Sequence, residues 1–120
     1  MTGRPLHVLF VCAMNKRRSA TAEQMYRNDA RLTVRSAGVH TEARRRVSEG
    51  DLAWADIVFV MEREHRTVLR ERYSHVELPP VVILDIPDDF EYMAAELQAI
   101  LRLNVDAELD LVFAARPENG

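Results

Sequence analysis

Residues 6–23 read LHVLFVCAMNKRRSATAE, and the rest of the architecture can be worked out from this segment. It begins with an apolar run, Leu6 to Val11, typical of a strand buried on both faces of a parallel sheet. The run ends at Cys12, the single cysteine of the chain, and a polar loop follows. Apolar residues then return at helical spacing, at Ala22, Met25 and Tyr26. A strand, a loop and a helix in this order form the first unit of an α/β fold.

The same alternation continues along the chain. Further buried strands are expected at 32–34, 57–61 and 81–86, with helical spacing around 22–26, 52–55, 65–73 and 93–101. With 120 residues, 48% of them hydrophobic, the chain can bury one core. We therefore expect an α/β fold in a single domain. We expect its four-stranded parallel sheet to be flanked by helices on both faces.

The C-terminal tail is less clearly patterned. We place the domain at 1–104 and a tail at 105–120. Val105, Leu109 and Val112 continue the helical stripe of the preceding segment, whereas Leu109, Leu111 and Phe113 alternate as a strand would. A helix is favoured, with a frayed end at 117–120. A helical tail must bury its apolar face on the domain or in a second chain, so a homodimer through the tail is one hypothesis.

Composition and charge exclude several classes of protein. The first apolar run is too short to span a membrane, and basic residues follow it where a signal peptide would have a cleavage site. A lone cysteine forms no internal disulfide, so we expect a cytoplasmic protein that does not act at a membrane. The net charge of −3 argues against nucleic acid as a partner. No metal and no cofactor are expected, because no ligand spacing supports them.

Cys12 lies where chemistry is expected in such a fold. Ligands of open parallel sheets bind beyond the carboxyl ends of the strands. The loop N–H groups and the dipole of a helix starting near Ser19 converge there and favour both an anion and a thiolate. No glycine lies between the two residues, so Asn15 is the residue best able to adopt the positive φ that the loop requires. Cys12 alone fits a buried strand end equally well, but the Cys-x5-Arg spacing lets Arg18 grip the phosphate that the thiolate attacks.

These features resemble the low-molecular-weight protein tyrosine phosphatases, and most closely a bacterial branch of predicted protein tyrosine phosphatases. The resemblance rests on VLFVCAMNKRRSATAE, RSAG at 35–38, RRRV at 44–47, WADIVFVME at 54–62 and LDIPDDFEYM at 84–93. It covers residues 6 to about 102. It implies hydrolysis of a phosphomonoester, in a phosphotyrosine-containing protein or a small molecule, through a phosphocysteine intermediate.

The resemblance also implies roles for individual residues. Cys12 would be the nucleophile, and Arg18 the bidentate ligand of the phosphoryl oxygens. Ser19 would hydrogen-bond the thiolate, and Ser36 would help to hold Asn15. The remaining phosphate-binding loop positions are Ala13, Met14, Lys16 and Arg17.

A phenol leaving group, with a pKa near 10, requires a general acid. The family takes it from an Asp-Pro pair after the fourth strand, but here the acid is not adjacent to Pro87. We favour Asp85, at the end of the strand, with Asp88 as the alternative. Phe90 and Tyr92 lie where the family places aromatic walls for the substrate, and packing against the last helix is an equal alternative.

Some residues depart from the family pattern. Met14 and Arg17 replace a glycine and a second cysteine found in many members, and Ala20 replaces a proline. Without a resolving cysteine, a thiol-relay arsenate reductase is excluded. A non-catalytic phosphate or phosphopeptide binding module remains the alternative function. The arginines at 44–46 are interpreted as a solvated helix face in preference to a surface that steers acidic phosphopeptides. The physiological substrate stays open between phosphotyrosine, phosphoarginine and a small phosphate ester.

Overall fold

The computed structural model describes residues 4–116 and contains the expected alternation of strands and helices. Four strands and four helices follow one another in the order β1 (Leu6–Cys12), α1 (Arg18–Tyr26), β2 (Leu32–Gly38), α2 (Glu49–Trp54), β3 (Ile57–Val60), α3 (Arg63–Arg72), β4 (Val81–Ile83) and α4 (Ala95–Ala115). The four predicted strands are confirmed. β2 extends further than its apolar run indicated, whereas β3 and β4 end before the predicted residues 61 and 86.

The sheet is parallel throughout, with strand order β2-β1-β3-β4. β1 pairs with β2 from Leu6 opposite Leu32 to Cys12 opposite Gly38, and its other edge pairs with β3. The chain moves outward from β1 to β2 and then returns to the other side of β1 at β3. Cys12 therefore ends a central strand at the point where the winding direction reverses, which is where open α/β sheets bind ligands.

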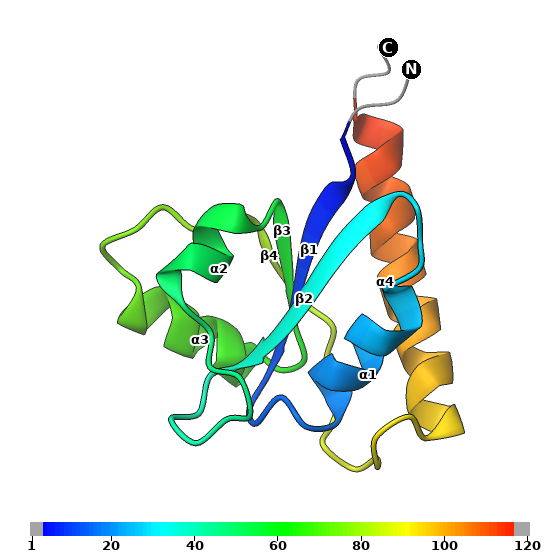
Figure 1. Cartoon of the computed structure of the whole chain (residues 1–120), viewed down its shortest axis with the longest axis horizontal. Helices are drawn as coiled ribbons and strands as arrows, with labels where there is room; N and C mark the ends of the chain where they lie inside the picture. The colour runs from blue at the N-terminus through cyan, green and yellow to red at the C-terminus, as the bar shows by residue number, and fades with distance from the viewer. Residues whose placement is uncertain (1–3, 117–120) are drawn as a thin grey trace.

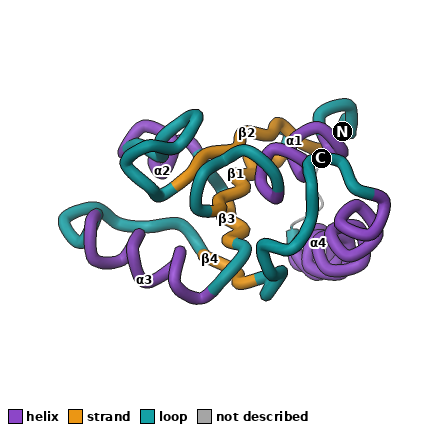
Figure 2. The backbone as a smooth tube through the Cα atoms, turned by 90° about the horizontal axis from the view of Figure 1, so that it is seen from below, coloured by secondary structure: helices purple, strands orange, loops and turns teal. Residues whose placement is uncertain are grey.

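Helices cover both faces of the sheet, as predicted. α1 and α4 lie on one face, and α2 and α3 on the other (Figures 1 and 2). The carboxyl ends of the strands point down in Figure 1, and Figure 2 looks directly onto the loops that follow them. These loops carry the candidate site.

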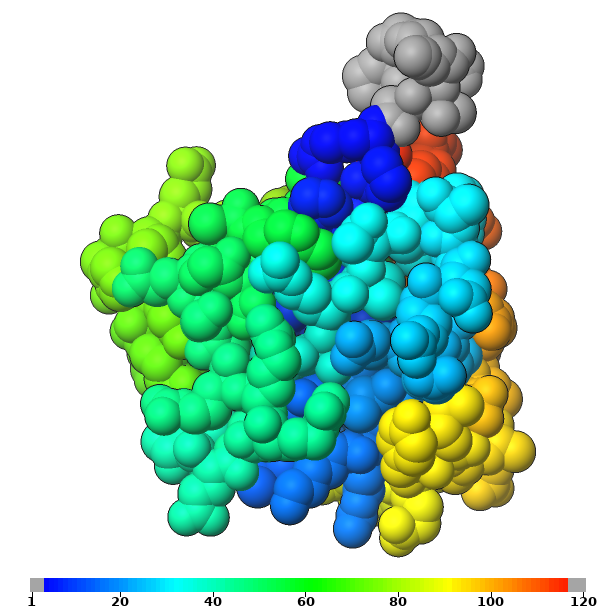
Figure 3. Space-filling model, in the orientation of Figure 1, coloured from blue at the N-terminus to red at the C-terminus, as the bar shows by residue number. Residues whose placement is uncertain are grey.

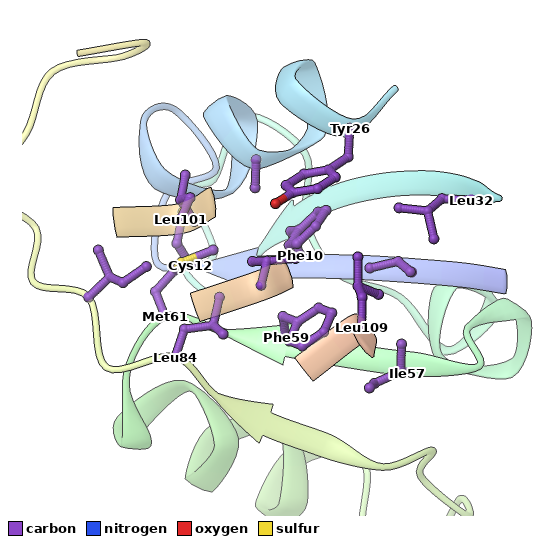
Figure 4. Packing of buried hydrophobic residues seen from close by; sticks show 14 of the residues in the cluster. Phe10, Cys12, Tyr26, Leu32, Ile57, Phe59, Met61, Leu84, Leu101 and Leu109 are labelled. Atoms are coloured by element: carbon purple, nitrogen blue, oxygen red, sulfur yellow. The ribbon is translucent and has the colours of Figure 1, made fainter. Parts of the chain in front are cut away.

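The alternating directions of the strand side chains create two hydrophobic layers. Phe10 and Phe59, on neighbouring strands, stack with ring centroids 5.7 Å apart and pack towards α4 (Figure 4). Leu9 and Val58 point the other way, towards the layer formed with α2 and α3. Because both faces are covered, the strands are apolar at consecutive positions.

The tail is helical, which confirms the favoured assignment. α4 continues without a break across residue 104, and Leu101, Val105 and Leu109 are fully buried against the sheet. Val112 and Phe113 also pack against this core. The chain thus covers the face that had suggested a homodimer, so that face provides no support for a dimer. The predicted frayed end at 117–120 lies outside the described residues.

A partly buried hydrogen bond links the two helices on this face. The hydroxyl of Tyr26 on α1 donates to Oδ1 of Asp106 on α4, at 2.7 Å. Burial, followed by the neighbouring Asp106, raises the pKa of Tyr26, so its hydroxyl keeps the proton that it donates. This contact fixes the C-terminal end of α1, whose N-terminal end borders the candidate site. Among residues 4–116, no helix has the length and apolar character needed to cross a membrane.

Two leucines on α4 provide a matched test of this packing. Leu101 is 0% exposed, whereas Leu103, on the outer side of the same helix, is 73% exposed. Leu101→Ala should lower the free energy of unfolding by roughly 2–5 kcal/mol, because it leaves a cavity under the helix. Leu103→Ala should change it by less than about 0.5 kcal/mol. Urea denaturation of both variants measures the difference, and equal effects would contradict this placement of α4.

Candidate active site

The loop between β1 and α1 curls around the sulfur atom of Cys12. The backbone N–H of Asn15 points at Sγ from 3.3 Å, and Oγ of Ser19 lies 3.0 Å from it. Asn15 has φ 58°, the positive value expected of the residue at which the loop turns. The sulfur atom therefore sits at the N-terminus of α1, where main-chain N–H groups and the helix dipole favour a negative charge.

A chain of buried hydrogen bonds sets the direction of the proton on Ser19. The carboxylate of Glu23 accepts from Oγ of Ser36, so Ser36 in turn accepts from Nδ2 of Asn15 at 2.9 Å. The second Nδ2 hydrogen of Asn15 goes to Oγ of Ser19 at 2.8 Å. Because Ser19 accepts there, its own hydrogen is available to the sulfur atom of Cys12. This network leaves the Ser19 hydroxyl as a donor, with Sγ of Cys12 at 3.0 Å as its nearer acceptor and the carbonyl group of Ala37 at 3.4 Å as the other.

A neighbouring segment holds the outside of the loop. The N–H groups of His40 and Arg44 donate to the carbonyl groups of Ala13 and Met14, at 3.0 and 2.9 Å. Nε of Arg44 donates to the carbonyl group of Asn15 at 2.9 Å. In a trans peptide the carbonyl and the following N–H point in opposite directions. Three carbonyl groups held on the outside therefore turn the following N–H groups to the inner side of the loop, and among these the N–H of Asn15 points at the sulfur atom.

This arrangement corrects the interpretation of the arginine run. Residues 44–46 lie in the loop between β2 and α2, so the predicted solvated helix face is wrong. Arg44 instead supports the loop between β1 and α1. Arg45 donates to the carbonyl group of Ser36 at 2.8 Å and forms an ion pair with the buried Asp51, and this pair lowers the pKa of the carboxyl against the effect of burial. Within the run, Arg46 is simply exposed.

Gly38, at the end of β2, allows the loop to approach the sheet closely. A Cβ atom at this position would overlap the carbonyl oxygen of Ala13 and lie 2.7 Å from Cβ of Ala43. Both the loop between β1 and α1 and the segment that supports it are packed against this glycine. A side chain here would have to displace one of them.

The guanidinium of Arg18 is buried and anchored by two loops. Only 2% of the residue is exposed. Its Nη1 donates to the carboxylate of Glu62, at the end of β3, and to the carbonyl group of Ile86 at 2.7 Å. Its Nε lies 3.6 Å from Oδ1 of Asp88. These partners compensate for the cost of burying the charge and fix the plane of the guanidinium beside the loop.

These residues surround one pocket of about 270 Å³, lined by Cys12, Met14, Lys16, Arg17, Arg18 and Asp88. Five of these six residues were predicted as the nucleophile, the arginine or other positions of the loop. The sixth is Asp88, one of the two candidate acids. Asp85 is exposed and does not line the pocket. Phe90 is partly buried and packs against the hydrophobic core that includes residues of α4. This agrees with the second of its two predicted roles, packing against the last helix. Tyr92 lies on a neighbouring hollow and is 50% exposed.

A buried histidine supports the end of β3. Nδ1 of His65 accepts the N–H of Glu62 at 3.1 Å and so fixes the start of α3. Burial, followed by the charge of Arg18, holds the pKa of His65 below its usual value, against the opposing effects of Glu62, Glu64 and Asp88. A neutral ring is required here, because a protonated Nδ1 is not an acceptor.

Several residues that shape the site were missed by the sequence analysis. Glu62 and His65 anchor Arg18 and its surroundings, Glu23 ends the Asn15 network, and Arg44 and Gly38 hold the loop. Glu62 had one usable signal, since it follows a buried strand at the sheet edge that carries Cys12. Glu23 lies one turn after Ser19 on the same helix, which also indicates proximity to the loop.

No protein-family model and no curated protein matches the sequence. Solved structures match the fold over nearly the whole chain. YfkJ from Bacillus subtilis is 19% identical, with a TM-score of 0.74 over 96% of this chain and 99% of that one. YwlE arginine phosphatase from Geobacillus stearothermophilus is 22% identical, with a TM-score of 0.68 over 95% and 100%.

A third match is SP-PTP, a low molecular weight protein tyrosine phosphatase from Streptococcus pyogenes. It is 14% identical, with a TM-score of 0.68 over 94% of this chain and 95% of that one. The chain therefore has the fold of the low-molecular-weight protein tyrosine phosphatases. The resemblance inferred from the sequence is confirmed at the level of the fold.

The close approach at Gly38 can be tested against a second glycine. Gly38→Ala should lower the free energy of unfolding by roughly 1–3 kcal/mol, because the new methyl group must displace backbone of the loop. Gly50 is the matched control, since a Cβ there meets only Oγ of Ser48 at 3.7 Å, inside α2. Gly50→Ala should be neutral or stabilising by up to about 1 kcal/mol. Urea denaturation compares them, and a neutral Gly38→Ala would argue against the tight packing.

The lowered pKa of His65 predicts a pH dependence of stability. Below about pH 6.5 the unfolded chain binds a proton at this residue that the folded chain resists, so the free energy of unfolding falls as the pH decreases. His65→Asn keeps an acceptor for Glu62 but does not titrate. It should be less stable at neutral pH and lose less stability on acidification to about pH 5.5.

Urea denaturation of both proteins at the two pH values measures the difference. The other histidines are common to both proteins, and the aspartates with lowered pKa values titrate in a more acidic range. Equal losses of stability on acidification would show that His65 does not contribute as argued.

Proposed function

We propose that this protein is a phosphomonoester hydrolase of the protein tyrosine phosphatase type, with Cys12 as its nucleophile. The observation that carries the proposal is one pocket that combines Sγ of Cys12, the loop N–H groups, the anchored Arg18 and the carboxylate of Asp88. A thiolate, a cradle for a tetrahedral anion and a nearby acid are what transfer of a phosphoryl group to cysteine requires.

In the first step, the Cys12 thiolate attacks phosphorus. The S–P bond forms as the bond between phosphorus and the leaving oxygen breaks, and Asp88 gives its proton to that oxygen. In the second step, the Asp88 carboxylate takes a proton from water, which attacks phosphorus and releases inorganic phosphate. The sulfur atom leaves as a thiolate, stabilised by the hydroxyl of Ser19 and the N–H of Asn15.

Arg18 would bind two phosphoryl oxygens through one edge of its guanidinium. Glu62 and the carbonyl group of Ile86 hold Nη1, so the edge formed by Nε and Nη2 is the one assigned to the substrate. Asp88 faces Nε at 3.6 Å, longer than an ordinary hydrogen bond. A phosphate bound to this edge would compete with that contact and leave Asp88 beside the leaving oxygen.

Asp88 is proposed as the general acid, in place of the Asp85 preferred from the sequence. Asp88 lines the pocket and approaches Arg18, whereas Asp85 is exposed, with φ 59°, between the buried residues Leu84 and Ile86. The strand ends at Ile83, so Asp85 already lies in the loop. Its position near the strand end therefore does not bring it to the sulfur atom.

The lining charges favour an uncharged leaving group. Lys16, Arg17 and Arg18 surround the sulfur atom, and Asp88 is the only carboxylate among the residues that line this pocket. A phosphoarginine substrate would add its own guanidinium beside these cations, whereas a phosphotyrosine presents a neutral ring. We propose phosphotyrosine in a protein as the substrate. A nucleophile without a second cysteine to protect it fits a reducing compartment, and the proposed location is the cytoplasm.

The pH profile of phosphatase activity tests this assignment. Cys12→Ser should reduce turnover of para-nitrophenyl phosphate and of a phosphotyrosyl peptide at least about a thousandfold, because it removes the nucleophile. Asp88→Asn should reduce turnover of the peptide by roughly 10²–10⁴ and that of para-nitrophenyl phosphate less, because nitrophenolate leaves without a proton. The alkaline limb of the peptide profile should flatten in this variant.

Asp85→Asn is the matched control and should remain close to the wild type. A large loss in Asp85→Asn with little change in Asp88→Asn would reverse the assignment of the acid. Binding of phosphate by the wild type without turnover of either substrate at any pH would instead identify a non-catalytic phosphate-binding module. A phosphoarginine peptide assayed in parallel decides between the two leaving groups.

A further inference from the structure

A second and larger hollow begins beside the proposed active site and runs along α1 and β2. It has a volume of about 880 Å³, and the residues that line it are Lys16, Ala20, Glu23, Gln24, Arg27, Leu32, Thr33, Val34, Arg44 and Tyr92. We call it the α1–β2 groove. In Figure 3, α1 in blue lies between cyan residues of the β2 region and yellow residues around position 90. The proposed reaction gives no role to the end of the groove that carries Arg27.

The groove adjoins the pocket at Cys12. Lys16 lines both of them, and Tyr92 belongs to the loop that also carries Asp88. Arg44 connects them from the other side, since its Nε is fixed at 2.9 Å from the carbonyl group of Asn15. A chain whose phosphorylated side chain enters the pocket therefore has the groove as an adjoining surface.

The groove carries positive charge on a protein whose net charge is negative. Lys16, Arg27 and Arg44 line it, with Glu23 as the one carboxylate among its lining residues, and Glu23 is hydrogen-bonded inward to Ser36. The whole chain has a net charge of −3. Arg27, at the far end, is exposed and hydrogen-bonds only the neutral side chain of Gln24 among the described residues. This surface complements an acidic segment.

We propose that the α1–β2 groove binds an acidic segment of the phosphorylated substrate protein, with Arg27 as the cation that selects it. This inference rests on the proposed function and adds a requirement on the sequence around the phosphorylated residue. The ring of Tyr92, half exposed at the rim, provides an apolar surface for the peptide between the two sites.

The geometry of α1 gives the spacing of the acidic residue. From Ala20, near the pocket, to Arg27 is roughly 10 Å along a helix that rises about 1.5 Å per residue. An extended peptide covers about 3.3 Å per residue. The acidic side chain should therefore lie about three residues from the phosphorylated one.

Three phosphotyrosyl peptides test the proposal. They share an alanine and serine background and carry a pair of glutamates about three residues before the phosphotyrosine, a pair about three residues after it, or none. The wild type should hydrolyse one of the acidic peptides with a kcat/KM about fivefold above that of the neutral peptide, the upper range for one exposed ion pair. The preference should decrease as salt is added.

Arg27→Glu should abolish or invert this preference and leave turnover of para-nitrophenyl phosphate unchanged, because that substrate does not reach the groove. Arg70→Glu makes the same charge change on the exposed surface of α3, on the other face of the sheet, and should keep the preference. A wild type that does not distinguish the peptides, or an Arg27→Glu variant that prefers the same acidic peptide as strongly as the wild type, overturns the proposal.

A binding measurement separates this inference from the proposed chemistry. The same peptides, carrying a fluorescent label, are titrated with Cys12→Ser and with Cys12→Ser combined with Arg27→Glu. A preference that is present in the first protein and lost in the second supports the groove even if the wild type turns over no substrate. Equal affinities for all three peptides count against the groove even if the enzyme is active.

Discussion

The buried guanidinium of Arg18 connects the parts of the molecule that form the site. A charge that is 2% exposed is tolerated only when partners replace its water, and those partners come from separate loops. Glu62 lies at the end of β3, and Ile86 lies beyond β4. The requirement to satisfy one side chain at the start of α1 therefore fixes the relative positions of three loops. The same contacts hold the guanidinium in the pocket that Cys12 also lines.

The sulfur atom depends on a second constraint, the direction of the hydrogen bonds that lead to it. Serine hydroxyl groups can donate in either direction, so Ser19 alone would not favour a thiolate over a thiol. The carboxylate of Glu23 can only accept, and this removes the ambiguity through Ser36 and Asn15. The positive φ of Asn15 serves the same purpose, because it turns the backbone N–H of this residue onto Sγ. One asparagine thus provides both the turn of the loop and the link in the network.

The parts of this structure that the sequence predicted are those that depend on local pattern. Buried parallel strands appear as short apolar runs, and the segment from Cys12 to Ser19 is continuous, so its strand, loop and helix could be placed directly. Residues that reach the site across the fold were harder to identify. Glu62 is 44 residues from Arg18, and its one local signal, a position just after a buried strand, does not show which side chain it contacts. Asp85 and Asp88 differ by three positions in a loop, where spacing does not determine which side chain turns inward. Residues 44–46 were misread for a related reason, because three arginines have no apolar partners to show whether they belong to a helix or a loop.

The acidic residues near the site have an electrostatic consequence for the proposed mechanism. Glu62 and Asp88 both lie close to Arg18, yet they contact different atoms of the guanidinium. Glu62 holds Nη1 by a direct, partly buried hydrogen bond, which an incoming phosphate would have to break to displace it. Asp88 faces Nε across 3.6 Å and is more than half exposed, and its contact is the weaker of the two. A phosphate dianion would therefore replace Asp88 and leave Glu62 in place.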